Sequence, residues 1–266
     1  MSPVVPPVVP PVVPPASAAG SALRAPEATH GARADKVRSK RRQTLEFLAL
    51  LLGAMALRVF VAEPYEIPTG SMLPTVQIGD RLVISKLSYG ARIPFTSADQ
   101  VRWGAPHRGD IVVLLNPKDG MPDLAKRVVA VGGDVVEVHD GRLMLNQHEL
   151  PEWPVSGECF DQDRNEQTQE WVRVKCTAFR QTLDGTTFVI HHMPDGPPPD
   201  FGPLTIPPDQ VFLMGDNRDR SLDSRWFGAV PAGKLKGRAF GILWSSGPYG
   251  PRWNRFLSPI QAPAQP

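Results

Sequence analysis

The sequence predicts a mainly β protein, built from several curled antiparallel sheets behind one N-terminal transmembrane helix. Beyond residue 63, short runs of β-branched residues recur between turn residues, as is typical of short strands. No run of strands alternates with helices of about 10–15 residues, which argues against a parallel α/β sheet. Proline accounts for 30 of 266 residues, and an interior proline costs a helix about 3 kcal/mol.

Residues 1–43 form a Pro-rich and basic tail. The first sixteen residues contain seven prolines in a PPVV-like repeat, which favours polyproline II or disorder, with a partner-binding role as the alternative. The tail carries a net charge of +5, whereas the whole chain carries +2. This near-balance gives no support to a nucleic-acid binder that relies on bulk positive charge.

Residues 44–62, TLEFLALLLGAMALRVFVA, predict a transmembrane helix. Nineteen helical residues span about 28 Å, close to the hydrocarbon thickness of a bilayer. A buried core helix and a cleavable signal peptide are the alternatives. Cleavage after Ala62 would place the large Phe60 at position −3, so an uncleaved anchor is favoured. The positive-inside rule then keeps residues 1–43 in the cytoplasm and exports the remainder.

The exported part is expected to divide into 63–146, an inserted extension at 147–204, and 205–266 with the C-terminal segment. Asp140-Gly141 and Asp184-Gly185 each predict a tight hairpin turn. Strands are expected at seven places, namely 81–87, 110–115, 127–131, 134–138, 142–146, 186–192 and 211–214.

Both cysteines, Cys159 and Cys176, fall in the extension. Thiols on the exported side of a membrane meet oxidising conditions, which favour a disulfide. Such a bridge would stabilise the fold by about 3 kcal/mol in the chain-entropy model. Two unpaired buried thiols are the alternative.

Ser71 is the first candidate for catalysis. It follows Gly70 and lies between Pro68 and Pro74, so a stiff loop would hold its hydroxyl exposed to a substrate. An ordinary turn is the alternative reading of this Gly-Ser pair.

A nucleophilic serine needs a base, and the histidines are scattered along the chain. His191 and His192 are adjacent in a predicted strand and point to opposite faces, so they cannot form a two-ligand metal clamp and a structural role is expected. Lysine replaces histidine in Ser-Lys hydrolases if burial lowers its pKa from about 10.4. Lys126, at the start of an apolar strand, meets this requirement, and Lys86 competes with it.

The polar segment from Met214 to Gly228 is the third candidate. It is either a solvated loop or a hydrogen-bonded network that packs beneath an active site and orients the lysine.

Together these segments resemble the type I signal peptidases, which are membrane-bound serine proteases. The family pattern P-S-G-S-M-x-P-T corresponds here to Pro68-Thr69-Gly70-Ser71-Met72-Leu73-Pro74-Thr75. Three further segments match in the same order, namely Gly79-Asp80 with Lys86 and Tyr89-Gly90; Lys126, Arg127, Val128, Gly133 and Asp134; and Gly215 through Arg225. The match covers roughly residues 60–146 and 205–245.

The resemblance implies that Ser71 is the nucleophile and Lys126 the general base. It implies an oxyanion hole made by the Thr69 hydroxyl and the Ser71 backbone N–H, although Thr69 stands where serine is commoner. In the lysine segment, Ala130 and Gly132 replace the family's Gly and Pro.

The resemblance also assigns supporting roles. Ser221 would hydrogen-bond Lys126 and orient it, and Asp223 and Arg225 would form a structural ion pair beneath the site. Tyr65 and Ile67 would help to line pockets for small substrate residues at positions −1 and −3.

The implied activity is removal of N-terminal signal peptides from exported preproteins through a Ser-Lys acyl-enzyme. The implied location is the bacterial inner membrane, with the catalytic domain on the exported side and the lipid bilayer and signal peptides as partners. No cofactor, metal or nucleic acid is implied, and no feature indicates an oligomeric state.

Two other functions are compatible with parts of the sequence. A self-cleaving Ser-Lys repressor would need a DNA-binding helix-turn-helix in place of residues 1–62, and none is visible in the sequence. The second alternative is a non-catalytic, signal-peptidase-like scaffold or adaptor that is anchored in the membrane. An activity assay distinguishes it from the protease.

Overall fold

The structure is a computed structural model that describes residues 40, 42–54, 62–91, 101–116, 122–165, 168, 170–194, 196 and 199–260. The chain divides into two compact units, Met1–Leu51 and Leu52–Pro266, which are described separately. Residues 42–54 are helical. Within the described residues, no helix has both the length and the apolar character needed to cross a membrane. The Pro-rich repeat and residues 55–61 of the predicted span lie outside the described residues.

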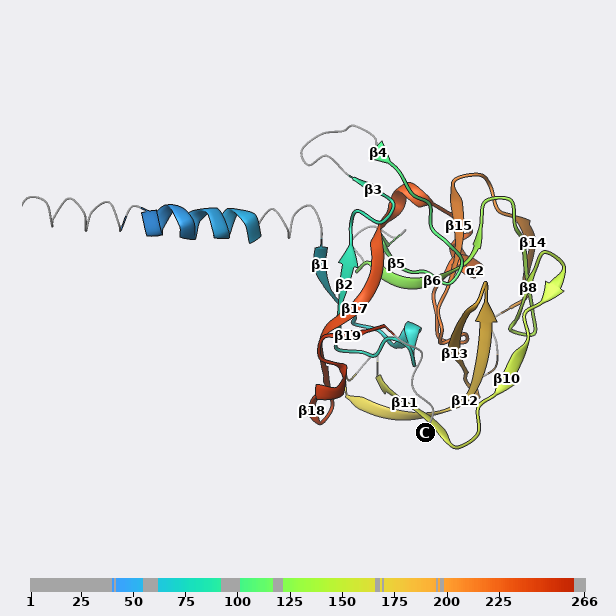
Figure 1. Cartoon of the computed structure of the whole chain (residues 1–266). Coiled ribbons are helices and arrows are strands. Elements are labelled where there is room, and N and C mark those ends of the chain that lie inside the picture. Colours follow the sequence, from blue (N-terminus) through green and yellow to red (C-terminus); the bar gives the residue numbers. More distant parts are fainter. Residues whose placement is uncertain are drawn as a thin grey trace, which may run out of the picture. The chain divides into compact units, whose positions relative to one another are not determined.

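In the remainder of the described chain, the regular secondary structure is almost entirely β (Figure 1). Its strands are Ala62–Glu66 (β1), Asp80–Ser85 (β2), Gly90–Ala91 (β3), Val101–Arg102 (β4), Ile111–Leu114 (β5), Leu124–Val131 (β6), Val135–His139 (β7), Arg142–Leu145 (β8), His148–Glu149 (β9), Glu152–Pro154 (β10), Cys159–Arg164 (β11), Trp171–Leu183 (β12), Thr186–His192 (β13), Phe201–Thr205 (β14), Gln210–Met214 (β15), Val230–Pro231 (β16), Leu235–Gly247 (β17), Gly250–Pro251 (β18) and Ser258–Pro259 (β19). Short helical turns occur at Gly70–Met72 (η1), Ser224–Phe227 (α2), Ala232–Lys234 (η2) and Trp253–Arg255 (η3).

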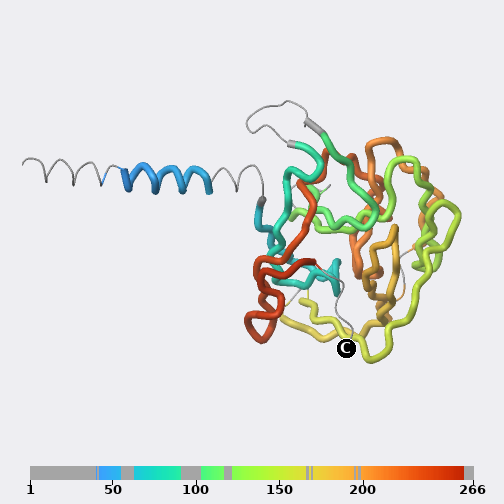
Figure 2. Tube along the Cα trace, viewed as in Figure 1, coloured from blue at the N-terminus to red at the C-terminus, as the bar shows by residue number. Residues whose placement is uncertain are grey.

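A nine-stranded sheet runs in the order β1-β2-β17-β5-β6-β15-β16, with β18 and β19 also paired to β17. All of its strand pairs among the described residues are antiparallel, and the register shifts repeatedly along β17. Such bulges bend and twist a strand. In Figure 2, the orange-red β17 runs beside the blue-green β2, with which it pairs. The expectation of curled antiparallel sheets is confirmed.

Two smaller sheets contain strands of the predicted extension, which supplies all four strands of the first but, in the second, only β9 and most of β14. One contains β10-β12-β11 with β13 paired to β12, and the other runs β14-β7-β8-β9. Both predicted hairpin turns are confirmed, because β7 pairs with β8 and β12 pairs with β13 across them. Asp140 and Asp184 adopt φ values of 46° and 47°, and the glycine after each is also left-handed, as a two-residue hairpin turn requires.

The buried core joins the extension to the large sheet. Phe188 and Ile190 of β13 pack in one cluster with Val129 of β6 and Phe212 of β15. A second cluster lies under β2 and β17 and includes Ile67 and Met72, which flank the Ser71 loop. Burying one such side chain stabilises the fold by about 1.5–3 kcal/mol. The core thus holds the segments around Ser71 and Lys126 in fixed positions.

Candidate active site

Ser71 lies in η1, within the loop that connects β1 to β2. The loop is closed by hydrogen bonds from Leu73 N to Gly70 O at 3.1 Å and from Val76 N to Met72 O at 2.9 Å. Met72 anchors the turn because its side chain is only 1% exposed in the core. Ser71 itself is 9% exposed, so a rigid turn presents its hydroxyl at the edge of the buried region.

Lys126 lies on β6, whose interior residues are buried on both faces. Its side chain is 1% exposed, and its Nζ donates a hydrogen bond of 2.6 Å to Ser71 Oγ. Burial lowers the pKa of Lys126 from 10.5 to about 8, and the nearby Arg225 guanidinium acts in the same direction against the carboxylates of Asp223 and Asp216. The amine is therefore readily deprotonated near neutral pH.

The other predicted site residues near Ser71 occupy different environments. Thr69 Oγ1 is 3.4 Å from Ser71 Oγ, on an exposed residue. Ile67 is buried in the core cluster, and Tyr65 packs against that cluster from a partly exposed position. The competing lysine, Lys86, forms an ion pair of 2.9 Å with Glu63.

The segment after β15 supports the Ser71 turn from beneath. Asn217 donates from its backbone N–H to Ser71 O and from its side-chain amide to Gly70 O, both at 3.2 Å. Gly215 lies in contact with the same turn. A Cβ at this position would overlap both the Ser71 carbonyl oxygen and Ser221 Oγ. Glycine is therefore required by the close approach of two backbone segments.

Two buried ion pairs hold this segment. Arg127, next to Lys126 in sequence, binds Asp216 through two hydrogen bonds of 2.7 and 2.6 Å, and Thr75 Oγ1 donates to the same carboxylate at 2.5 Å. Arg225 binds Asp223 through two hydrogen bonds of 2.8 Å. Burial opposes ionisation of Asp223, but the guanidinium of Arg225 holds the pKa of that carboxyl below its ordinary value. The sequence analysis does not predict the Arg127–Asp216 pair, although both residues lie in segments that match the family pattern.

Ser221 is also buried, at 5% exposure, and its hydroxyl helps the Arg225 guanidinium to lower the pKa of Asp223, while no hydrogen bond joins its Oγ to Lys126 among the described residues. The hydrogen bond to Lys126 that the resemblance implied is thus not formed in this structure. The reason is geometric, because Ser221 Oγ lies against Gly215 while Lys126 Nζ is directed to Ser71.

Comparison with known proteins places this chain in a family. The model of the family "Signal peptidase, peptidase S26" matches residues 41–244. A signal peptidase I from Pseudomonas fluorescens is 35% identical over 213 residues, which cover 76% of this chain and 71% of that protein. Signal peptidase I of Pseudomonas aeruginosa is 31% identical over 220 residues, with the same coverage. The chain belongs to the signal peptidase family S26. It is a serine endopeptidase of the signal peptidase I type, and it removes signal peptides.

A crystal structure of a signal peptidase I from Enterococcus faecalis is also similar in sequence, at 28% identity. The match covers 51% of this chain and 97% of that chain, with a TM-score of 0.29. The family assignment therefore rests on the sequence matches.

The extension borders the Ser71 turn of this signal peptidase. A Cβ at Gly70 would lie 3.0 Å from Asp163 Oδ1 on β11. From β12, Gln181 accepts a hydrogen bond of 2.6 Å from the fully buried Arg218. Residues of the extension thus contact both segments that form the site. Cys159 and Cys176 are joined by a disulfide between β11 and β12.

Proposed function

We propose that Ser71 is the nucleophile and Lys126 the general base of this signal peptidase. The observation that carries the proposal is the 2.6 Å hydrogen bond between Lys126 Nζ and Ser71 Oγ, made by an amine that is almost completely buried. A neutral amine at hydrogen-bonding distance from a hydroxyl is the arrangement that general-base activation of a serine requires.

In the first step, Ser71 Oγ attacks the scissile carbonyl carbon while Lys126 Nζ takes the hydroxyl proton. The tetrahedral intermediate collapses, the C–N bond breaks, and the departing amine of the mature protein takes that proton from Lys126. A water molecule then attacks the acyl-enzyme, with Lys126 again accepting the proton. Hydrolysis releases the signal peptide as a carboxylic acid and restores the Ser71 hydroxyl.

Thr69 and the Ser71 backbone N–H are proposed to form the oxyanion hole. The position of the Thr69 hydroxyl beside Ser71 Oγ, at 3.4 Å, supports this role. One such donor is worth about 2.7–4 kcal/mol of transition-state stabilisation.

Ser221 is proposed to orient Lys126 once the lysine is charged. An ammonium has three donors, and only one of them is used toward Ser71. The buried hydroxyl oxygen of Ser221 offers an acceptor in the same region, including while its proton is directed to Asp223. The Asp223–Arg225 pair is proposed to keep that region rigid.

The finer aspects of substrate and location extend this proposal. The enzyme would cleave after small residues at −1 and −3, in pockets that Tyr65 and Ile67 help to line. Residues 44–62 would anchor the enzyme in the lipid bilayer of the bacterial inner membrane, with residues 1–43 in the cytoplasm. The parts 63–146 and 205–266 would form the catalytic core on the exported side, with 147–204 as its extension.

The test is processing of a preprotein by the full chain and its variants. Ser71→Ala and Lys126→Ala are each expected to abolish cleavage, whereas Lys86→Ala, which removes the lysine paired with Glu63, should cleave normally. Thr69→Val removes the hydroxyl but keeps the shape, and should lower kcat by about 10²–10³. Normal processing by either the Ser71 or the Lys126 variant would overturn the assignment.

A further inference from the structure

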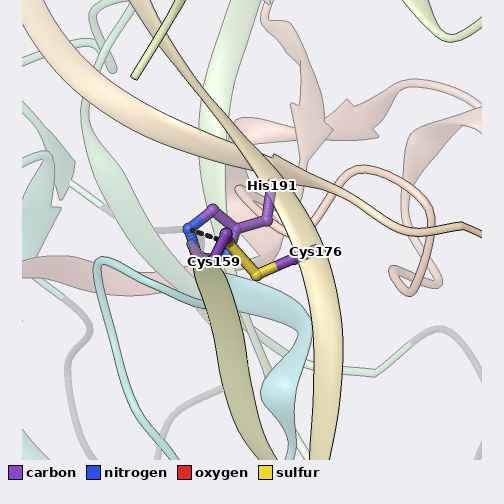
Figure 3. Close-up of side chains that lie close together, drawn as sticks. All are labelled: Cys159, Cys176 and His191. Carbon is purple, nitrogen blue, oxygen red and sulfur yellow. Dashed lines mark hydrogen bonds between the residues drawn. A yellow bond between two sulfur atoms is a disulfide. The ribbon is translucent and has the colours of Figure 1, made fainter. Parts of the chain in front are cut away.

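The disulfide of the extension lies against a buried histidine (Figure 3). Cys159 and Cys176 face each other on β11 and β12, and His191 lies on β13, the strand on the other edge of β12. His191 Nε2 points at Cys159 Sγ at a distance of 3.6 Å. The ligand-capable atoms of all three residues lie within 4.8 Å of one another. Neighbouring strands thus bring two sulfurs and an imidazole together.

Asp161 fixes the orientation of this imidazole. Its carboxylate oxygens lie 2.9 and 3.0 Å from His191 Nδ1, and both side chains are more than nine-tenths buried. A carboxylate only accepts hydrogen bonds, so Nδ1 carries a proton, and in the Nδ1–H tautomer the Nε2 lone pair points toward the sulfur. Zinc-ligating histidines show this arrangement, with one ring nitrogen on the metal and the other donating to a carboxylate.

The distance between Cys159 Sγ and His191 Nε2 agrees with zinc coordination, and the two sulfurs, which are bonded to each other in the oxidised chain, would separate on reduction. Tetrahedral zinc with sulfur at about 2.3 Å and imidazole nitrogen at about 2.0 Å separates those two atoms by about 3.5 Å. The distance between Cys159 Sγ and His191 Nε2 is 3.6 Å. Two thiolates and one imidazole make a Cys₂His ligand set, and a water molecule would complete the tetrahedron.

The backbone of His191 is held as firmly as its side chain. Its N–H donates to Asp216 O and its carbonyl accepts from Arg218 N, both at 2.9 Å. The ligand nitrogen therefore keeps its position when the disulfide opens. His192, the next residue, contacts Asp219 and Glu152 instead, so the ligand set does not require both histidines to share one face.

We propose that Cys159, Cys176 and His191 form a Zn²⁺ site that is masked by the disulfide and opens on its reduction, with Asp161 as a positioning residue. A dithiol or phosphine reductant supplies two electrons and is itself oxidised, the S–S bond breaks, and each sulfur takes one proton. Zn²⁺ then displaces both thiol protons as the two Zn–S bonds form. In the oxidised chain both sulfurs are in the disulfide, so no thiolate is present and Zn²⁺ does not bind at this position.

The test uses the full chain in detergent and Co²⁺ as a spectroscopic probe for Zn²⁺. One sample stays oxidised, and the other is reduced anaerobically with a phosphine that is then removed. The reduced chain should bind one equivalent of Co²⁺ with a thiolate charge-transfer band and tetrahedral d–d bands, and added Zn²⁺ should bleach both. The oxidised chain should show neither band.

Matched variants separate this site from adventitious binding. Cys176→Ser and His191→Asn should each weaken Co²⁺ binding, whereas His148→Asn at an exposed histidine should not. Asp161→Asn should weaken binding by about 10- to 100-fold. Asp163→Asn, two residues along the same strand and paired with Arg220, should leave it unchanged. Circular dichroism checks that each variant folds.

The proposal is overturned if the reduced wild-type chain with Co²⁺ gives no spectrum of tetrahedral thiolate coordination. A wild-type chain that unfolds on reduction, and so gives no such spectrum, also overturns it. It is equally overturned if folded His191→Asn binds as tightly as wild type. Neither result depends on whether Ser71 and Lys126 are catalytic, because metal binding is measured directly.

Discussion

Lys126 has one of the largest fully buried side chains of the described residues, and its amine lies 2.6 Å from Ser71 Oγ. Burial lowers its pKa to about 8. Only the neutral amine accepts a proton, so with Lys126 as the proposed base about one chain in ten would be active at pH 7. We predict that kcat/KM rises about tenfold per pH unit below pH 8 and levels off above it. The measurement is the pH profile of signal-peptide cleavage.

Lys86→Ala is the control, and its profile should keep the same midpoint because that lysine pairs with Glu63 away from the buried amine. A profile whose midpoint lies near pH 10.5, the ordinary value for lysine, would show that burial does not act on the base.

Gly215 offers a second test at a single residue, without touching the reacting groups. An added methyl would overlap the Ser71 carbonyl oxygen and Ser221 Oγ, so Gly215→Ala must displace the Ser71 turn. A misplacement of about 1 Å can cost about 10²-fold in rate. We predict that kcat falls at least that far while the variant remains folded, as measured by preprotein cleavage and circular dichroism.

Gly233→Ala is the matched control, because a Cβ there meets no atom within 4 Å. If Gly215→Ala cleaves as fast as Gly233→Ala, the close packing between the two segments has no bearing on catalysis.

The sequence could indicate the reacting residues but not their contact. Ser71 and Lys126 are 55 residues apart, and no local periodicity relates positions so distant in a β protein. The motifs predicted both residues, and the Asp223–Arg225 pair is present as expected. The Arg127–Asp216 pair was missed because its members lie on segments that only the folded sheet brings together.

At the scale of elements, His192 joins three segments near the site. From the end of β13, it lies 3.3 Å from both Asp219, in the segment after β15, and Glu152 on β10. Burial alone would lower the pKa of His192, but these carboxylates outweigh it and raise the pKa from 6.5 to about 9. Because the pKa of His192 is higher in the folded state, the contacts of its charged ring with Asp219 and Glu152 stabilise the fold. This contribution to the free energy of unfolding is complete below pH 6.5 and is lost as the pH rises through 9.

We therefore predict that His192→Gln destabilises the fold most at low pH, by up to about 3 kcal/mol, with the difference from wild type shrinking toward pH 9. Urea unfolding at several pH values measures it. The exposed His148→Gln should differ little from wild type throughout. A His192→Gln effect that grows with pH would contradict the direction of the shift.

Strand positions were largely predictable, since all seven expected strands are present. The misses are informative. β17 pairs with β2 through a register that shifts twice, and it contains Gly237 and Gly241, so it lacks a clear strand pattern in the sequence. A Cβ at Gly237 would overlap Ser85 O, so glycine there permits close strand approach rather than ending the strand. Similarly, β1 begins at Ala62, the last residue of the predicted span.

On the scale of the whole molecule, one sheet unites the site. The Ser71 turn follows β1, Lys126 lies on β6, and the Gly215–Arg225 segment follows β15. The central position of β17 between β2 and β5 connects these elements. A sequence pattern specifies individual strands, whereas strand order depends on long-range pairing, so this arrangement could not be deduced from the motifs alone.

The proposed anchor leads to a prediction about the whole chain. Residues 44–62 contain ten Leu, Phe or Val residues, each contributing about −0.3 to −0.6 kcal/mol to membrane insertion, whereas an arginine at the helix centre costs about 2.5–3.5 kcal/mol. Leu51→Arg together with Leu52→Arg should thus offset the whole apolar contribution. We predict that this variant moves to the soluble fraction after carbonate extraction and loses preprotein processing in cells. Leu51→Ile with Leu52→Ile should remain in the membrane, and an arginine variant that stays there would refute the anchor.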